Sequence, residues 1–353
     1  MIAAPSHAPL RRRGLVGCLL IAAGLLLLGW TVWLALPGAA PHRYVQVGQG
    51  GAERFAGLYL EGLWEGPVTA YEAHVEGVAK PVATFHVAQT EHAGPVLLDW
   101  RNHGHEPLVH LGSDAEQTAA LARAIATHSP RGSLILAWWD TSRQLQLLAG
   151  VDVVVGTHLG APLVVPATWD DRRDAIERLE RAFWGSAEAD APASAPFEQF
   201  VDALVSDETS GVAALRALAG GREAYIVVHQ ADAYRAGLLR PAQFGVGYRD
   251  FPKSGDLHRL VRVVKSWVAA EGYTGYAVQA RTESADDSSG RTRVYFLTDE
   301  RSTQTLLARM LPFTTSNPLL LDELRLVFQH GGYWVYRLPG ADTPAATTER
   351  HSP

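Results

Sequence analysis

The chain has 353 residues, of which 47% are hydrophobic and 19% charged, a composition typical of a globular protein with one large domain or two smaller ones. The net charge of −6, with no Lys/Arg-rich run outside residues 11–13, excludes a general nucleic-acid binder, which needs a basic face for phosphates. The single cysteine, Cys18, excludes an intramolecular disulfide, a cysteine-rich zinc site and a C-x-x-C-H attachment site for haem.

The N-terminal segment has the pattern of a membrane anchor. Arg11, Arg12 and Arg13 precede residues 14–36, about 23 residues without a charge. That length crosses a bilayer as a helix and exceeds the apolar region of a cleaved signal peptide. Because basic flanks stay in the cytoplasm, residues 1–13 are predicted to be cytoplasmic and everything after the span to be exported. The expected location is the inner membrane, crossed once, with the C-terminal domain in the periplasm.

Residues 37–340 are predicted to form one periplasmic domain of the α/β class with a mixture of strands and helices. Strands or hairpins are predicted over residues 42–49, 58–79, 82–100, 133–137, 151–159, 224–229, 276–279, 293–297, 324–329 and 333–338. Helices are predicted over residues 114–128, 143–148, 170–183, 197–205, 207–218, 256–270 and 302–311. The composition of residues 185–196 predicts an exposed loop, and that of residues 341–353 a disordered tail.

Several side chains are given local roles by these patterns. Ser113 or Asp114 is expected to cap the helix over residues 114–128. The buried faces of two amphipathic helices are expected to consist of Ile176, Leu179 and Phe183 in one, and of Leu260, Val263, Val264 and Trp267 in the other.

Residues 133–150 combine a strand, a polar segment and a helix start. Residues 133–137 are aliphatic enough for a buried strand, and Gly150 suits the end of the helix that follows. In an open α/β sheet, ligands bind at the carboxyl ends of strands, where a helix N-terminus presents free backbone N–H groups. The sequence therefore predicts a binding site formed by Trp138, Trp139, Asp140, Thr141, Ser142 and Arg143.

A purely structural interpretation of the same segment stays open. Asp140, Thr141 and Ser142 are all good N-cap residues, so Asp140 would only cap the helix. One tryptophan would then fill the core and the other would cover it. If the segment is a site, Trp139 is the ring expected in the crevice, because it adjoins Asp140 beyond the end of the strand.

No catalytic residue is assigned. The sequence has no G-x-S-x-G, no GK[ST] and no H-E-x-x-H pattern. The best candidate for a metal site is the H-x-H of His103 and His105, with Glu106 or His110 as a further ligand. Among 14 histidines, such spacing also arises by chance, so neither a metal nor another cofactor is predicted.

Three segments of the chain resemble the soluble domain of oligosaccharyltransferase catalytic subunits. They are Trp138-Trp139-Asp140 at a strand end, SDET at residues 206–209, which opens a helix that leads to AYIVV at residues 224–228, and FQHGGYWVYRL at residues 328–338. In that family the W-W-D motif helps to bind the acceptor peptide, which implies a peptide- or glycan-binding domain. This chain has Thr141 and Ser142 where the family has Tyr-Gly, and it lacks the many membrane helices that carry the family's metal-binding and catalytic acids. Glycosyl transfer by this chain alone is therefore not expected.

A single N-terminal anchor before such a domain, with AWWDTSRQLQLLAG at its centre, also resembles the hydroxylamine oxidation protein HaoB family. That family is associated with the multihaem hydroxylamine oxidoreductase of nitrifying and methane-oxidising bacteria. The resemblance implies a periplasmic accessory role, as a partner or assembly factor of the oxidoreductase or of its electron-transfer partners. It supplies no catalytic residues. Peptide or glycan binding at the W-W-D motif is the alternative function.

Overall fold

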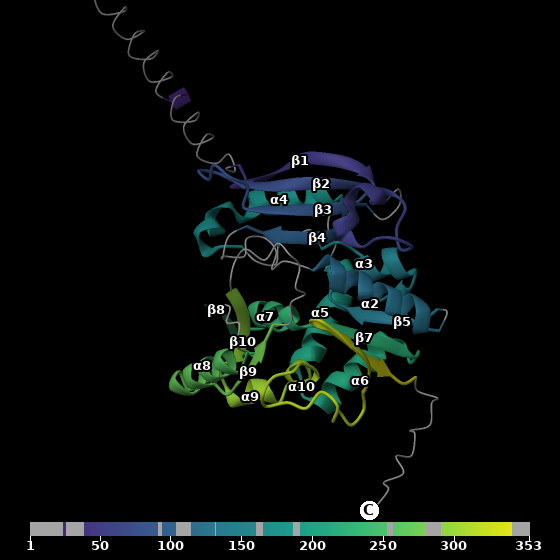
Figure 1. The fold of residues 1–353 in the computed structure, drawn as a ribbon, viewed down its shortest axis with the longest axis vertical. Helices are drawn as coiled ribbons and strands as arrows, with labels where there is room; N and C mark the ends of the chain where they lie inside the picture. Colours follow the sequence, from purple (N-terminus) through teal and green to yellow (C-terminus); the bar gives the residue numbers. More distant parts are fainter. Residues whose placement is uncertain are drawn as a thin grey trace, which may run out of the picture.

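The computed structural model describes residues 24–25, 39–90, 94–103, 114–130, 132–159, 165–185, 191–252, 257–279 and 291–340. Of the predicted anchor, only Gly24 and Leu25 are among them, and the predicted tail lies outside them. No helix within these ranges has the length and hydropathy needed to span a membrane. The described chain forms three sheets with helices between and around them, so the predicted mixed α/β class is confirmed for this part (Figure 1).

The first sheet is antiparallel and lies at the end of the molecule where the chain enters β1 (Figure 1). Its strands, in spatial order, are β1 (His42–Gly51), β2 (Pro67–Val75), β3 (Ala83–Ala88) and β4 (Val96–Asn102). The prediction of antiparallel strands is confirmed. Residues 58–66 are not part of them, because the short helical segment η1 (Ala52–Leu58) and turns occupy the connection from β1 to β2.

Helix α4 (Arg173–Trp184) covers one face of this sheet and follows the short helical segment η2 (Ala167–Arg172). Its buried residues are Ala175, Ile176, Glu180 and Trp184, whereas Leu179 and Phe183, which were predicted to be buried, are only partly so. The helix can bury Glu180 because the carboxylate accepts three hydrogen bonds: from His42 Nε2 at 2.8 Å, Tyr44 Oη at 2.7 Å and Trp184 Nε1 at 2.9 Å.

The central sheet has five strands. In spatial order they are β11 (Arg325–His330), β12 (Tyr333–Leu338), β7 (Ala224–His229), β5 (Leu134–Ala137) and β6 (Asp152–Val153). Strand β5 runs parallel to both β6 and β7, while β12 is antiparallel to β7 and β11. The predicted hairpin across residues 330–332 is confirmed, and Gly331 has a φ of 56° in its turn.

The predicted buried strand over residues 151–159 is wrong in length and burial. Strand β6 has two residues, of which Asp152 is exposed and Val153 partly buried. It lies at the edge of the sheet and pairs only with β5, itself four residues long. After Val153 the backbone N–H of Val154 still donates to the carbonyl of Ile135 at 3.1 Å, but the chain then leaves the sheet, and Val155 is buried outside it in the core.

Helices cover both faces of the central sheet. Helices α2 (Ala115–His128) and α3 (Trp139–Ala149) pack with Ile135, Ala137 and Val227 on one face. The other face, which includes Leu136 and Ile226, is covered by α5 (Ala191–Val205), α6 (Glu208–Leu218) and α7 (Gln230–Leu239). The caps of α2 and α6 are as local sequence predicts, since Asp114 and Asp207 accept backbone N–H groups of the first turns.

The loop predicted over residues 185–196 is wrong for its second half. Helix α5 begins at Ala191 and contains Pro196, while residues 186–190 lie outside the described part of the chain. The buried side chains of Phe197, Phe200 and Leu204 stabilise this helix. The preceding Ala-rich residues have a high intrinsic helix propensity and extend it toward the N-terminus.

The third sheet contains β8 (Val246–Pro252), β10 (Arg291–Leu297) and β9 (Gly275–Val278), in that order and all antiparallel. Helix α8 (Leu257–Ala270) packs on it through Leu260, Val264 and Val268, so the expected burial of Val263 is wrong: it is 49% exposed. The chain also forms α9 (Glu300–Thr303) and α10 (Leu306–Met310) where one helix was predicted, because the Thr305 side chain caps α10 and ends the first helix. Neither α7 nor β8 was predicted.

Candidate functional site

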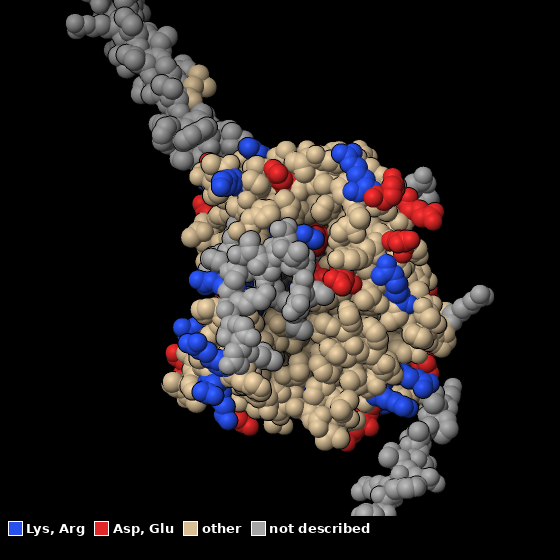
Figure 2. Space-filling view, in the orientation of Figure 1, with Lys and Arg blue, Asp and Glu red and all other residues tan. Residues whose placement is uncertain are grey.

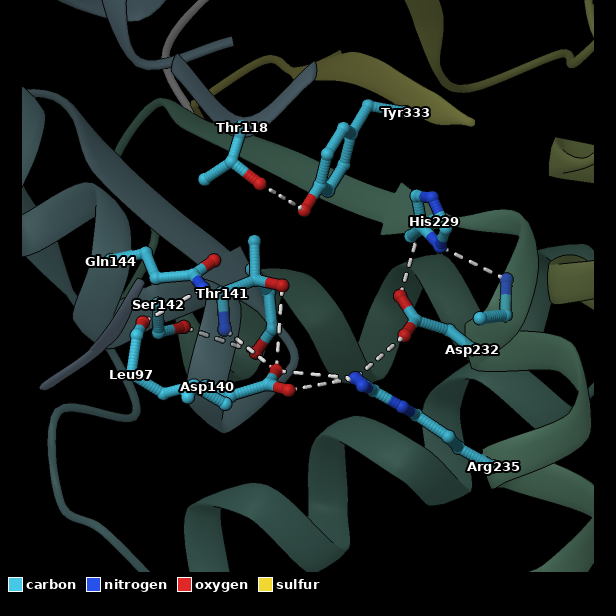
Figure 3. A network of polar contacts seen from close by, with 12 residues as sticks. Leu97, Thr118, Asp140, Thr141, Ser142, Gln144, His229, Asp232, Arg235 and Tyr333 are labelled. Atoms are coloured by element: carbon cyan, nitrogen blue, oxygen red, sulfur yellow. Dashed lines mark hydrogen bonds and ion pairs between the residues drawn. The ribbon is translucent and has the colours of Figure 1, made fainter. Parts of the chain in front are cut away.

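The predicted site lies where two parallel strands of the central sheet end. Strands β5 and β7 are neighbours, and each continues directly into a helix, α3 and α7 respectively. Helix α3 packs on one face of the sheet and α7 on the other. Such a point, where connections leave adjacent strands toward opposite faces, is the usual ligand position in open α/β sheets. Side chains from the two helix starts meet here (Figure 3).

The start of α3 differs from the prediction. Its N-cap is Trp138, which makes no side-chain cap, and the helix begins at Trp139, so Asp140, Thr141 and Ser142 lie within the first turn rather than before it. The predicted capping role of these three residues is therefore wrong. The helix begins early because Ser142 bonds back to the end of the strand: its N–H donates to Trp138 O at 2.8 Å and its hydroxyl to Ala137 O at 3.1 Å. The predicted stop at Gly150 is confirmed, with a φ of 65°.

The Asp140 carboxylate instead pairs with a residue of α7. Arg235 Nη1 lies 3.0 Å from its Oδ2 and 3.2 Å from its Oδ1, and both side chains are only 6% exposed. The backbone N–H of Thr141 donates to Asp140 Oδ1 at 2.7 Å. Arg235 also lies 3.4 Å from Asp232 Oδ1, and its guanidinium carbon is 5.7 Å from the centre of the Trp138 ring. A buried ion pair therefore joins the two helix starts across the sheet (Figure 3).

The N-terminus of α7 is held by a reciprocal capping arrangement. His229 Nδ1 accepts the N–H of Ala231 at 3.1 Å, and Asp232 Oδ2 accepts the N–H of His229 at 2.8 Å. Burial, together with the nearby Arg235 cation, lowers the pKa of His229 to about 4, so the imidazole is neutral with its proton on Nε2. Burial raises the pKa of Asp232 to about 7, against the opposing effect of Arg235.

Tyr333 of β12 closes the network beside His229. The two ring centres are 4.6 Å apart, and the Tyr333 hydroxyl lies 3.1 Å from Thr118 Oγ1 of α2. Burial raises the pKa of Tyr333, so its hydroxyl stays protonated at any physiological pH. Gln117 of α2 accepts the backbone N–H of Gly332 at 2.6 Å. The hairpin of β11 and β12 is thereby tied to α2.

The remaining polar residues at the start of α3 face the first sheet. Arg143 Nη2 donates to the carbonyl of Pro95 at 2.8 Å, and Gln144 Nε2 donates to that of Leu97 at 2.9 Å. Burial lowers the pKa of Arg143 to about 10. These side chains satisfy backbone carbonyls at the start of β4 and join the first sheet to the central one.

Both tryptophans of the predicted site are packed in the core. Trp138 is 0% exposed and lies edge-on to Phe197 at 5.0 Å. Trp139, the ring expected in the crevice, is 5% exposed and lies 4.5 Å from His158, which stacks on Trp184 at 4.8 Å. A stacking platform needs an exposed ring face, and neither ring presents one. All six predicted residues are thus brought together and buried, and ligand binding by them stays a prediction.

The candidate metal ligands are not brought together in the described part of the chain. His103 is exposed just beyond β4, while His105, Glu106 and His110 lie outside the described residues. Among the residues that are described, no three His, Cys, Asp or Glu side chains are grouped as a metal would require.

The side chains that surround Asp140 in this network were not anticipated from the sequence, namely His229, Asp232 and Arg235 at the start of α7, and Thr118 and Tyr333 beside them. A signal for two of them was present, because His229 and Asp232 stand at capping-box spacing directly after the predicted strand over residues 224–229. Arg235 follows Asp232 by three positions and had no signature of its own.

The fold and the site together define a mixed α/β protein in which a buried ion pair lies at the carboxyl ends of the two central parallel strands, β5 and β7. The chain belongs to the family described as HaoA-associated protein HaoB, whose profile matches residues 10–338. The resemblance to this family is therefore confirmed. No curated protein shows significant similarity to the chain. Among solved structures, the C-terminal domain of PglB from C. jejuni is similar with a TM-score of 0.35 and 12% identity, over 62% of this chain and 98% of that domain.

Proposed function

We propose that this chain is a membrane-anchored periplasmic protein that assists hydroxylamine oxidation as a partner or assembly factor of the hydroxylamine oxidoreductase. The observation that carries the proposal is the family match, which spans residues 10–338 and whose description names an HaoA-associated protein. An accessory role follows directly from that description.

The geometry of the strand ends favours a structural role for the buried charged residues. The side chains of Asp140, Asp232 and Arg235 are at most 6% exposed and bind one another. A substrate would have to displace one of these partners to reach another, and leaving a buried charge uncompensated costs about 3–5 kcal/mol. The network therefore serves best to hold the starts of α3 and α7 in place.

Affinity capture tests the proposed partnership. The full-length chain, tagged at its C-terminus and crosslinked in native membranes, should recover the hydroxylamine oxidoreductase or its electron acceptors. An unrelated single-pass protein with the same tag is the control. Repeated failure to enrich these proteins over the control, after crosslinking, would overturn the proposal.

The proposed location, with the C-terminal domain in the periplasm, depends on the predicted N-terminal anchor. Arg11, Arg12 and Arg13 precede about 23 uncharged residues, so a reporter fused after Pro353 should be active only outside the cytoplasm. Replacing the three arginines with glutamates should weaken this orientation. A cytoplasmic C-terminus in the unmodified protein would contradict both the location and the partnership.

A further inference from the structure

The fold begins close to the end of the predicted anchor. Pro41 is buried, and its carbonyl accepts the N–H of Glu76 at 2.9 Å. The next residue, His42, is 4% exposed and bonds to Glu180 of α4 at 2.8 Å. Because the predicted span ends at residue 36, only residues 37–41 connect it to the fold. Even fully extended, a connection of this length reaches no more than about 18 Å, at about 3.6 Å per residue.

This short connection determines which end of the first sheet lies near the membrane. Strand β1 pairs with β2 so that His42 lies opposite Val75, which places the turn from β2 to β3 beside the start of β1. Figure 1 shows the described chain entering β1 at this end of the sheet. The turn from β2 to β3 is therefore held within reach of the lipid head groups.

The tip of this turn is exposed and apolar. All of residues 76–80 are exposed, and Val78 is 47% exposed. The turn is well defined, because the N–H of Val78 donates to Val75 O at 3.1 Å and Gly77 has a φ of 78°. Turns in water more often carry Asn, Asp or Ser, whose side chains bond to their own backbone. Positions 77–79 are instead Gly, Val and Ala, which suit a less aqueous environment.

The charges around the tip suit a layer of lipid head groups. Lys80 follows the apolar residues directly, and Arg43 is exposed at the start of β1. Glu76, the carboxylate of the turn, already pairs with Arg172 at 2.6 Å. Figure 2 shows basic and acidic side chains together at this end of the molecule. A long basic side chain beside an apolar tip reaches lipid phosphates while the tip lies deeper, at the boundary with the acyl chains.

A contact of this size is sufficient because the anchor already holds the domain at the membrane. One exposed valine and one lysine would bind a separate bilayer only weakly. When the turn is tied to the anchor through a few residues, however, its contact with the bilayer is intramolecular and takes place at a high effective concentration. A second point of attachment would restrict rotation of the domain about its tether.

We propose that the turn of residues 76–80 inserts Val78 and Ala79 into the head-group layer of the membrane that holds the predicted anchor, with Lys80 at the lipid phosphates. This inference rests on the proposed location of the chain and adds that the domain lies against the bilayer in one orientation. The first sheet faces the lipid, and the central and third sheets lie farther away (Figure 1). A bilayer is favoured over a protein partner because the short tether keeps the turn beside lipid.

Fluorescence of the full-length chain in vesicles tests this contact. Cys18 is the only cysteine, so Cys18→Ser allows one environment-sensitive fluorophore at a chosen position. The informative variant is Val78→Cys, with Ala79→Cys as a second site. The matched control is Val327→Cys, because Val327 is 45% exposed and lies on β11, at the edge of the central sheet. In vesicles containing phosphatidylglycerol, emission from positions 78 and 79 should shift to shorter wavelength and be quenched by lipid spin-labelled near its head group. Position 327 should show neither effect.

The outcomes separate this inference from the proposed location. A fluorophore on Cys18 of the otherwise unmodified protein reports on the anchor and should be quenched by lipid spin-labelled deep in its acyl chains. If Cys18 is quenched while positions 78 and 79 behave like position 327, the membrane contact is refuted and the anchor stands. If Cys18 is not quenched either, both fail.

A further outcome identifies a different occupant of the turn. Protection of position 78 from aqueous iodide, without quenching by spin-labelled lipid, would show that a second copy of the chain covers the turn, and would overturn the proposal. Melting temperatures equal to that of the unmodified protein show that the labelled variants are folded.

Discussion

Replacing Asp140 by Asn should destabilise the protein strongly. An N-cap would tolerate the change, because Asn and Asp cap equally well. In the structure, however, Asp140 is the principal counter-charge of the buried Arg235, at 3.0 and 3.2 Å. Breaking a buried pair costs about 3–5 kcal/mol. In the variant the amide oxygen at position 140 can still accept the Thr141 N–H, and Asp232, 3.4 Å from Arg235, still compensates part of the arginine's charge. We therefore expect the free energy of unfolding to fall by about 2–4 kcal/mol.

Urea denaturation of the purified protein measures this loss as a shift of the midpoint at constant slope. The matched control is Glu76→Gln, which breaks the exposed pair between Arg172 and Glu76 at 2.6 Å and should cost less than about 1 kcal/mol. A double-mutant cycle of Asp140→Asn with Arg235→Met should give a coupling energy of about 2 kcal/mol or more. If Asp140→Asn costs no more than Glu76→Gln, the ion pair does not hold the two helix starts together.

Three further predictions follow from buried groups. The pKa of His229 is lowered from 6.5 to about 4, so the contribution of the neutral imidazole to stability is complete above pH 6.5 and is lost as pH falls toward 4. Urea denaturation at a series of pH values should therefore show the free energy of unfolding fall by at most about 3 kcal/mol over this range. The variant His229→Asn, which keeps a capping side chain, should not show this fall. Trp138→Phe and Trp139→Phe should both lower the melting temperature, each costing about 1–3 kcal/mol, and an unchanged value for Trp139→Phe would place that ring outside the core. Glu180→Gln supplies one acceptor oxygen in place of two, so one of the donors is left unpaired. Calorimetry should show the free energy of unfolding lowered by about 1–3 kcal/mol.

Much of the site's framework could be predicted because its signals are local. The strand that ends in His229 has the predicted bounds, Gly150 ends α3 as expected, and Asp114 caps α2, as one of the two expected caps. Each of these depends on residues within one turn of chain: a short polar side chain that bonds its own backbone, or a glycine that adopts a positive φ. The position of the W-W-D segment at a strand end was predictable for the same reason.

What Asp140 does was decided by tertiary structure. The residue has the chemistry of a cap, and nothing in its neighbourhood along the chain reveals that a cation 95 residues away lies beside it. The alignment of β5 with β7 places the starts of α3 and α7 side by side, and the low dielectric of the interior makes pairing with Arg235 far stronger than capping in water. The same holds for Glu180, a charged residue that is buried because three donors converge on its carboxylate. Local sequence sets which conformations are available, and the packing of distant segments determines which polar groups must find partners inside.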